Sequence, residues 1–298
     1  MTLRRIALLA AFVALASLQS GCNTQHVHQL EIQKYVEQPA SLIKQKNGGA
    51  SILYERDGHF YTAGYIAYLA GYDNQSIQNF SCYTQTPDEI IGLNAVWVAI
   101  YASFPSMWDY RHEITSSLHS LHGGDAQAVE ERRKRLKAMI IESIKPGAEA
   151  QPWQTGFLIH AYGDSYAHVD GEPPQAYGQI IGHAIPTLFG NSPDAIFLAN
   201  NHVRYLDFVT ELFDALSKGS TIFPADEEAL KRFKTEISEQ AKLGSDGNRK
   251  VTIIVKQGNV SYDWEENEKL CDGKDTTIDR SAIRLFLKKM SEQLDEPA

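Results

Sequence analysis

The sequence has little positive charge, few cysteines and only one long apolar run. Its 28 lysines and arginines are outnumbered by 37 aspartates and glutamates, which gives a formal net charge of −9. Bulk nucleic-acid binding depends on clustered basic residues, so we expect no extended nucleic-acid surface. A local anionic substrate is still compatible with this charge, because bound metal ions can dominate the field inside a site.

The long apolar run stands near the N-terminus, from Ile6 to Leu18, between two arginines and the stretch LQSGC. This pattern is typical of a secretory signal peptide, here residues 1–21, and it is too short for a transmembrane helix. The stretch LQSGC is similar to the lipobox of bacterial lipoproteins, in which the cysteine, here Cys22, is lipidated. Leu18 stands one position earlier than in that pattern. An ordinary cleaved signal peptide without lipidation is the alternative.

The lipoprotein interpretation predicts a lipid anchor in the bacterial cell envelope, at the outer membrane on its periplasmic or exterior face. Without the anchor the chain would be secreted. No second stretch approaches the roughly 20 apolar residues of a membrane span. After Cys22 only Cys82 and Cys271 remain. In an exported chain this pair makes a disulfide plausible, which would tie the C-terminal segment to the body, and two separate thiols are the alternative.

Composition and periodicity divide the rest of the chain into three parts. Polar residues 22–50 form a tether and linker, residues 51–245 a helical body, and residues 246–298 a C-terminal segment packed on that body. In the last part, RKVTIIVKQGNVSYDW predicts a short strand pair and RSAIRLFLKKMSEQL a final helix. The predicted fold is therefore mainly α, a multi-helix bundle with a small β element near the C-terminus.

Helix boundaries in the body follow from capping signals. HFYTAGYIAYLAG ends at Gly71, NQSIQNFSCYTQ ends before TPDE, and residues 125–144 carry acids early and bases late. A helix that begins near Pro152 runs to the breaker DGEPP. The next one is predicted to start with Ser192 as its N-cap and Pro193 in its first position.

The stretch LIHAYGDSYAHV places His160, Asp164 and His168 at steps of four residues. On a helix these positions form one gently winding stripe. Imidazole and carboxylate are ligands that suit zinc and similar divalent ions. The neighbouring residues are apolar or small, so the stripe should be buried, where an unpaired carboxylate is costly. A hydrogen-bonded core without metal would also satisfy these groups, and the stripe alone leaves both interpretations open.

Three further segments accompany the stripe, and the four together span residues 57–194: DGHFYTAGYIAYLAGY, YTQTPDE, HAYGDSYAH and IIGHAIPTLFGNSPD. In order and spacing they resemble the zinc-dependent phospholipase C and P1 nuclease superfamily. The resemblance implies an all-α fold with a cluster of two or three zinc ions. It assigns metal-ligand roles to His59, Asp88, His160, Asp164, His168 and His183.

The resemblance also implies one more histidine ligand between Asp88 and His160. His112, His119 and His122 compete for this role, and WDYRHEITSSLHSLH favours His112. Asp194 is either a further ligand or a carboxylate stabilised in the first turn of its helix.

Two departures from the family pattern bear on the number of zinc ions. The family commonly has more residues between the central aspartate and the second histidine than the three present here. A lipidated Cys22 could not bind zinc through its amino group. These departures favour two ions over three.

The activity implied by the resemblance is that of a metal-dependent phosphoester hydrolase, phospholipase C-like, which uses a zinc-bound hydroxide oriented by Asp88 or Asp164. Among phosphoester substrates, phospholipid head groups are favoured, because a lipid anchor would hold the site near the membrane. A nuclease or phosphatase of the same fold is one alternative. Another is a non-catalytic, zinc-stabilised lipoprotein that binds a partner, with closed four-ligand sites.

Overall fold

The computed structural model describes residues 56–102, 105–178, 194–198, 200–219, 221–243, 249–274 and 278–296. Within these ranges the chain is almost entirely helical, and the one sheet consists of two short strands. The prediction of a mainly α, multi-helix fold is therefore confirmed. The predicted signal peptide, Cys22 and His183 lie outside the described residues, as do Ser192 and Pro193.

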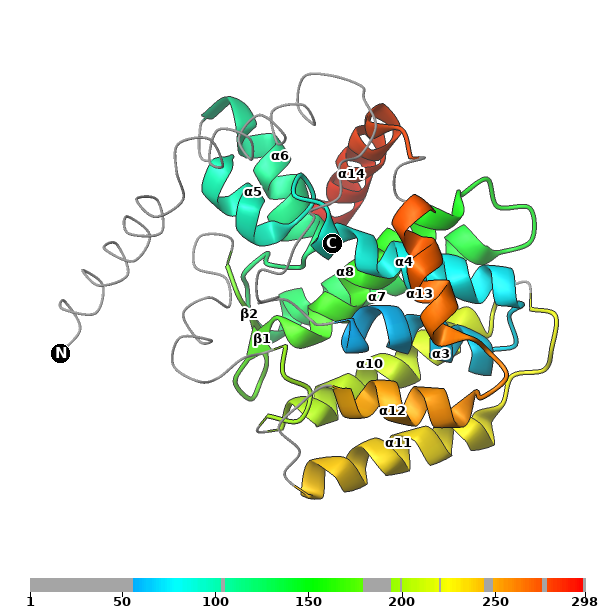
Figure 1. Cartoon of the computed structure of the whole chain (residues 1–298). Coiled ribbons are helices and arrows are strands. Elements are labelled where there is room, and N and C mark those ends of the chain that lie inside the picture. The colour runs from blue at the N-terminus through cyan, green and yellow to red at the C-terminus, as the bar shows by residue number, and fades with distance from the viewer. Residues whose placement is uncertain are drawn as a thin grey trace, which may run out of the picture.

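The described elements can be followed along the chain in Figure 1. They are η1 Asp57–Tyr61, α3 Thr62–Leu69, α4 Asn74–Glu89, α5 Ala95–Tyr101, η2 Pro105–Met107, α6 Trp108–His112, η3 Glu113–Leu118, α7 Ala126–Ile144, α8 Pro152–Ala167, β1 Val169–Asp170, β2 Gln175–Ala176, α10 Asn201–Leu216, α11 Glu227–Lys242, α12 Arg249–Gly258, α13 Trp264–Lys274 and α14 Arg280–Asp295.

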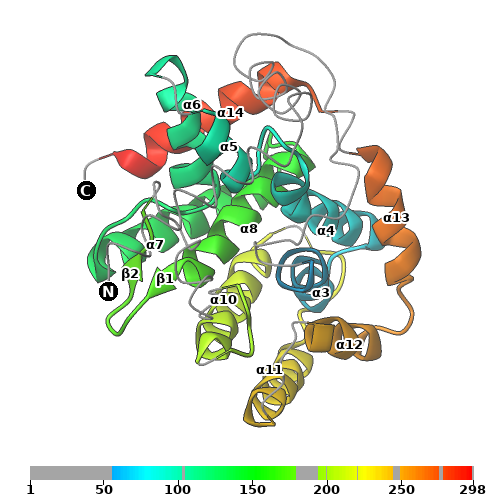
Figure 2. The ribbon, with the colours of Figure 1, turned by 60° about the vertical axis from the view of Figure 1, so that its left-hand side comes forward.

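Helix α8 runs through the middle of the molecule, with α4, α7 and α10 packed around it (Figure 2). Its start is specified locally: Pro152 occupies the first turn, and Gln151 and Gln154 form a capping box. From Thr155 to Ala167 every residue of α8 is buried. A helix that is buried on all sides belongs in the core, so its polar side chains must find partners inside the protein.

Two apolar cores share α8. The larger core takes residues from α3, α4, α7, α10, α11 and α12, together with the C-terminal part of α8. The smaller core joins α5, α6, η3 and α14 to Trp153 and Phe157 in the N-terminal part of α8. The C-terminal segment therefore packs on both cores, α12 on the larger and α14 on the two together.

Helix α4 is longer than the sequence predicts, since it continues through TPDE to Glu89. Pro87 lies inside the helix and removes only one backbone donor, while the N–H of Ile90 still bonds the carbonyl of Thr86 at 3.2 Å. The result matters for Asp88. It lies in the last turn of α4, and it is not the N-cap of a following helix.

The predicted strand pair after residue 245 is wrong. Residues 249–258 form helix α12, in which Val251, Ile254 and Val255 are buried at helical spacing while Ile253 is 43% exposed. The observed two-stranded sheet lies directly after α8 instead, where Val169 pairs with Ala176.

Helix α10 starts at Asn201, later than the predicted start at Pro193. Asp194 therefore lies in a turn, outside any helical first turn. Among the described helices, none combines the length and the apolar composition that a bilayer span requires.

Side-chain links join η1, α4 and α13. Cys82 of α4 and Cys271 of α13 form a disulfide, with their Cα atoms 5.3 Å apart, as the sequence suggested. Arg56, which precedes η1, forms ion pairs with Glu89 at 2.7 Å and with Glu268 of α13. These links hold η1, α4 and α13 together, and η1 and α4 each carry a residue of the site described next.

Candidate metal centre

Seven buried histidines and aspartates from separate parts of the chain meet beside α8, and we call them the central cluster. Helix α8 and its C-cap supply three of them, η1 and α4 one each, the turn after η3 one, and the turn before α10 one. The members are His59, Asp88, His119, His160, Asp164, His168 and Asp194. Each has no more than 9% of its surface exposed.

Asp164 is the hub of the central cluster. Its Oδ2 lies 3.1 Å from Nδ1 of His119, 3.3 Å from Nε2 of His160 and 3.6 Å from Nδ1 of His168. Its Oδ1 lies 3.2 Å from Nε2 of His59. One carboxylate is thus shared by four imidazoles, as would suit a ligand common to neighbouring ions.

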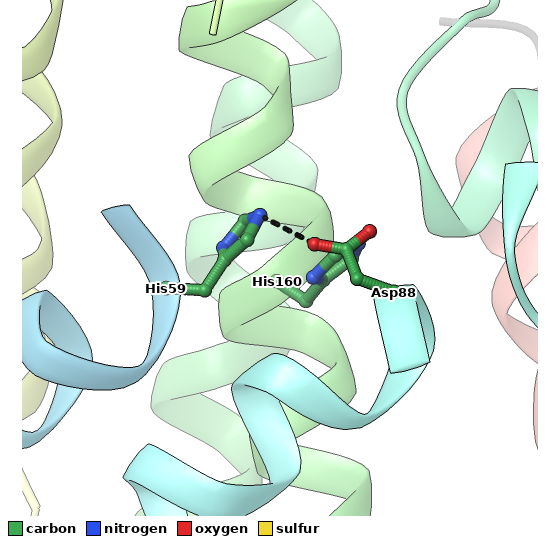
Figure 3. Close-up of side chains that lie close together, drawn as sticks. All are labelled: His59, Asp88 and His160. Atoms are coloured by element: carbon green, nitrogen blue, oxygen red, sulfur yellow. Dashed lines mark ion pairs between the residues drawn. The ribbon is translucent and has the colours of Figure 1, made fainter. Parts of the chain in front are cut away.

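His59 from η1 and Asp88 from α4 both approach α8 (Figure 3). Arg56, which precedes η1, pairs with Glu89 at the end of α4. Nε2 of His59 lies 3.5 Å from Oδ2 of Asp88, and the His59 ring packs against that of His160 with centroids 4.2 Å apart. His59 lies in η1, a π-helical turn, a conformation that is frequent at functional sites.

His119 is the histidine that reaches the cluster between Asp88 and His160, and the prediction in favour of His112 is wrong. His112 is seven residues earlier, at the end of α6, where it contacts Asp295 at 2.7 Å near the surface. His122 donates through Nδ1 to the carbonyl of Ser120 and lies outside the cluster. The π-helical turn η3 intervenes between α6 and His119 and turns His119 inward.

The sequence allows two roles for Asp194, a metal ligand or a carboxylate in the first turn of a helix. In the structure it lies in the cluster. Its Oδ1 is 3.2 Å from Nε2 of His168. The neighbouring backbone is held by α10, because the side-chain amide of Asn201 donates to the carbonyl of Ala195 at 3.0 Å.

Three cluster histidines are oriented by backbone carbonyls. Nδ1–H of His160 donates to Thr84 at 2.8 Å, Nε2–H of His119 to Leu93 at 2.9 Å, and Nδ1–H of His168 to His119 at 2.7 Å. A carbonyl can only accept, so each of these nitrogens carries the proton. In His119 and His160, whose pKa values are lowered, the opposite nitrogen is then an acceptor directed at the cluster, which is the arrangement of metal-ligating histidines. In His168 the opposite nitrogen faces Asp194.

The charges of the cluster favour a cation at its centre. Burial raises the pKa of Asp88 well above its ordinary value, and the charge of Asp164 raises it further. Burial alone would raise the pKa of Asp164, but His168 and His160 outweigh it and hold that pKa well below its ordinary value. Burial lowers the pKa of His119 and of His160, which keeps these rings neutral at neutral pH.

His168 differs from the other rings because it lies between two carboxylates. Burial alone would lower its pKa, but the charge of Asp164 and the hydrogen bond to Asp194 raise it to about 9.

Neither carboxylate oxygen of Asp88 accepts a hydrogen bond from the part of the chain that the structure describes. A bound divalent ion would balance these buried carboxylates.

Two groups of side chains within the cluster could each hold a metal ion. They are His59 with Asp88 and His160, and His119 with His160 and Asp164, and in each group the ligand atoms lie within 4.8 Å of one another. Nitrogen and carboxylate ligands at this spacing suit a divalent transition metal. Five of the predicted ligands therefore come together, and His119 and Asp194 join them.

Comparison with known proteins identifies no relative. No protein-family model, no curated protein and no solved structure matches this chain. Functional inference therefore rests on the central cluster and on the sequence motifs that form it.

Proposed function

We propose that this protein is a metal-dependent phosphoester hydrolase, phospholipase C-like, with two or three zinc ions held by the central cluster. The observation that carries the proposal is the orientation of its histidines. Three rings donate one N–H to a backbone carbonyl and direct the other nitrogen at buried carboxylates. Three buried aspartates in one cluster carry more negative charge than a purely structural hydrogen-bonded core would need.

Zinc in such a site would lower the pKa of a water molecule and stabilise negative charge on an attacked phosphoester. The protein's own residues divide the remaining work. Asp164, with four ring nitrogens within 3.6 Å, acts as a shared ligand that fixes the spacing of the ions.

Asp88 is the better candidate to orient the attacking water. It lies 3.5 Å from His59 and 3.9 Å from His119 and His160, so its contacts are longer than those of Asp164. Its carboxylate can therefore accept a hydrogen bond from the attacking water while it binds an ion. These longer contacts support a double role for Asp88, as ligand and as the group that orients the water.

Phospholipid head groups are the substrate class that we favour. If Cys22 is lipidated, the anchor would hold the site close to a bilayer surface, where such phosphoesters are concentrated. Nucleotides and other phosphodiesters remain the substrates against which phospholipid must be compared.

A non-catalytic zinc site is the second candidate, and one observation favours it. All four cluster histidines are 0% exposed, as in closed structural sites. In that case zinc would hold helices together, and the protein would bind a partner.

Elemental analysis and activity assays on the purified chain test these two candidates. Wild-type protein should hold two or three zinc ions and hydrolyse bis(p-nitrophenyl) phosphate or phosphatidylcholine vesicles, while Asp164→Ala loses metal and activity. The matched control is Asp295→Ala, a surface carboxylate that also pairs with a histidine. Less than half an ion per wild-type chain after zinc reconstitution would disprove the metal site. Bound zinc without hydrolysis of any phosphoester would favour the structural site.

A further inference from the structure

Ser120 follows His119 and has an unusual backbone conformation. Its φ is 52°, and among the described residues it is the one non-glycine with positive φ. This left-handed region is unfavourable for a residue with a Cβ atom. Such residues persist only where the surrounding structure imposes the conformation, and they cluster at functional sites.

The peptide group between His119 and Ser120 connects two members of the central cluster. Its carbonyl, that of His119, accepts the Nδ1–H of His168 at 2.7 Å. The φ angle of Ser120 sets the orientation of this peptide plane relative to the chain that follows. An ordinary negative φ would turn the carbonyl away from His168 and remove the bond that directs its Nε2 at Asp194.

The side chain of Ser120 fixes the same turn to α8. Its Oγ donates to the carbonyl of Ala161 at 2.7 Å, one residue after His160, and Ser120 is only 1% exposed. On the other side, Nδ1–H of His122 donates to the carbonyl of Ser120 at 2.9 Å. Both peptide groups that flank Ser120 are therefore held by histidines, and its hydroxyl ties the turn to the central helix.

From these contacts we infer that Ser120 is a positioning residue of the metal centre. It contacts no ion or substrate itself. It sets the direction of His119, through the left-handed turn, and of His168, through the carbonyl of residue 119. The inference rests on the proposed metal function, because it describes how two of the ligands are presented.

Two substitutions separate the hydroxyl from the backbone conformation. Ser120→Ala removes the hydrogen bond and leaves a Cβ atom in the left-handed turn, whereas Ser120→Gly removes the hydrogen bond but adopts positive φ readily. Ser165→Ala is the matched control. Ser165 is equally buried, and its Oγ also donates to a carbonyl of α8, that of Tyr162, at 2.7 Å.

The measurements are the zinc dissociation constant by chelator competition, the visible spectrum of the cobalt-loaded protein, and the melting temperature without metal. Without the Ser120 hydroxyl, the turn no longer fixes the carbonyl of His119 that accepts from His168, and disturbing such an outer hydrogen bond to a ligand typically weakens metal binding about 10- to 100-fold. We expect a loss of this size and an altered cobalt spectrum in Ser120→Ala and Ser120→Gly, while Ser165→Ala keeps wild-type affinity and spectrum. A purely structural role would lower the melting temperatures of Ser120→Ala and Ser165→Ala alike and leave zinc affinity and the spectrum unchanged.

Wild-type affinity and spectrum in both Ser120 variants would overturn the positioning role and leave the metal centre intact. If Ser120→Ala does not fold, Ser120→Gly decides, since it adopts the turn without strain. A wild-type chain that binds neither zinc nor cobalt would overturn the proposed function itself. The two failures are therefore distinguishable.

Discussion

In the described part of the chain, two groups of side chains join histidine to aspartate, and they differ in almost every other respect. The first is the central cluster beside α8. The second, which we call the surface cluster, consists of His112, Arg132, Ser291 and Asp295 at the end of α14. There Nε2 of His112 and Nη2 of Arg132 lie 2.7 and 3.1 Å from the two oxygens of Asp295, and Ser291 donates at 3.2 Å.

The surface cluster balances the charge of its carboxylate, and the central cluster does not. Asp295 is a single carboxylate with basic partners, and its side chain is 39% exposed to solvent. The central cluster places three carboxylates among four histidines that are 0% exposed. A histidine in contact with an aspartate therefore does not by itself indicate a metal site. Burial, an excess of carboxylates and carbonyl-oriented rings distinguish the central cluster.

The two clusters should differ most in zinc affinity when one histidine is removed from each. His119→Ala should weaken zinc binding by more than about 100-fold, because it removes a ligand and not just an outer hydrogen bond. His112→Ala should leave zinc binding unchanged. Chelator competition measures both. Equal affinities for the two variants would mean that His119 is not a ligand.

Removing one carboxylate from each cluster should affect stability unequally. With zinc present, Asp164→Ala should lower the free energy of unfolding by about 3–5 kcal/mol relative to wild type, because the variant no longer holds the metal and the buried groups of the cluster lose their shared partner. Asp295→Ala should cost less, about 1–3 kcal/mol, because Asp295 is partly exposed but its removal takes a partner from the buried guanidinium of Arg132. Urea denaturation measures both values. A larger loss for Asp295→Ala would reverse our assignment of the two clusters.

The smallest predicted effect is the pH dependence of the unfolding free energy that the surface cluster contributes. Burial alone would raise the pKa of Asp295, but the hydrogen bond from His112 and the charge of Arg132 outweigh it and lower that pKa. The pair therefore stabilises the fold above about pH 4, the unfolded pKa of aspartate, and this stability is lost as the pH falls below it.

The contribution should be at most about 1 kcal/mol after solvent screening. It can be measured as the difference in unfolding free energy between wild type and Asp295→Asn at pH 7 and at pH 3. The difference should shrink at pH 3 and also in high salt. A difference that stays constant with pH would mean that the ion pair adds nothing.

How far the site can be predicted from sequence depends on how its residues are spaced. His160, Asp164 and His168 share one helical period, so their alignment is visible in the sequence. His119 carries no such signal. The π-helical turn η3 and the left-handed Ser120 decide which of the three nearby histidines turns inward, and neither has a recognisable pattern.

Capping residues predict the bounds of α7 and α8 correctly, but not the start of α10, and the structure of α12 is missed because two patterns overlap there. In α12, Val251, Ile253 and Val255 alternate like a strand, while Val251, Ile254 and Val255 have helical spacing. Periodicity cannot choose between these patterns, and tertiary burial selects the helix. In α4, Pro87 suggested a boundary that the helix tolerates.

The disulfide between α4 and α13 has a consequence for the order of biosynthesis. Its cysteines are separated by 189 positions in the sequence, so the bond cannot close until α10, α11 and α12 have been made. Until then α4, which presents Asp88 in its last turn, lacks its covalent link to α13. The covalent brace on the helix that presents Asp88 is therefore one of the last parts of the site to form during synthesis.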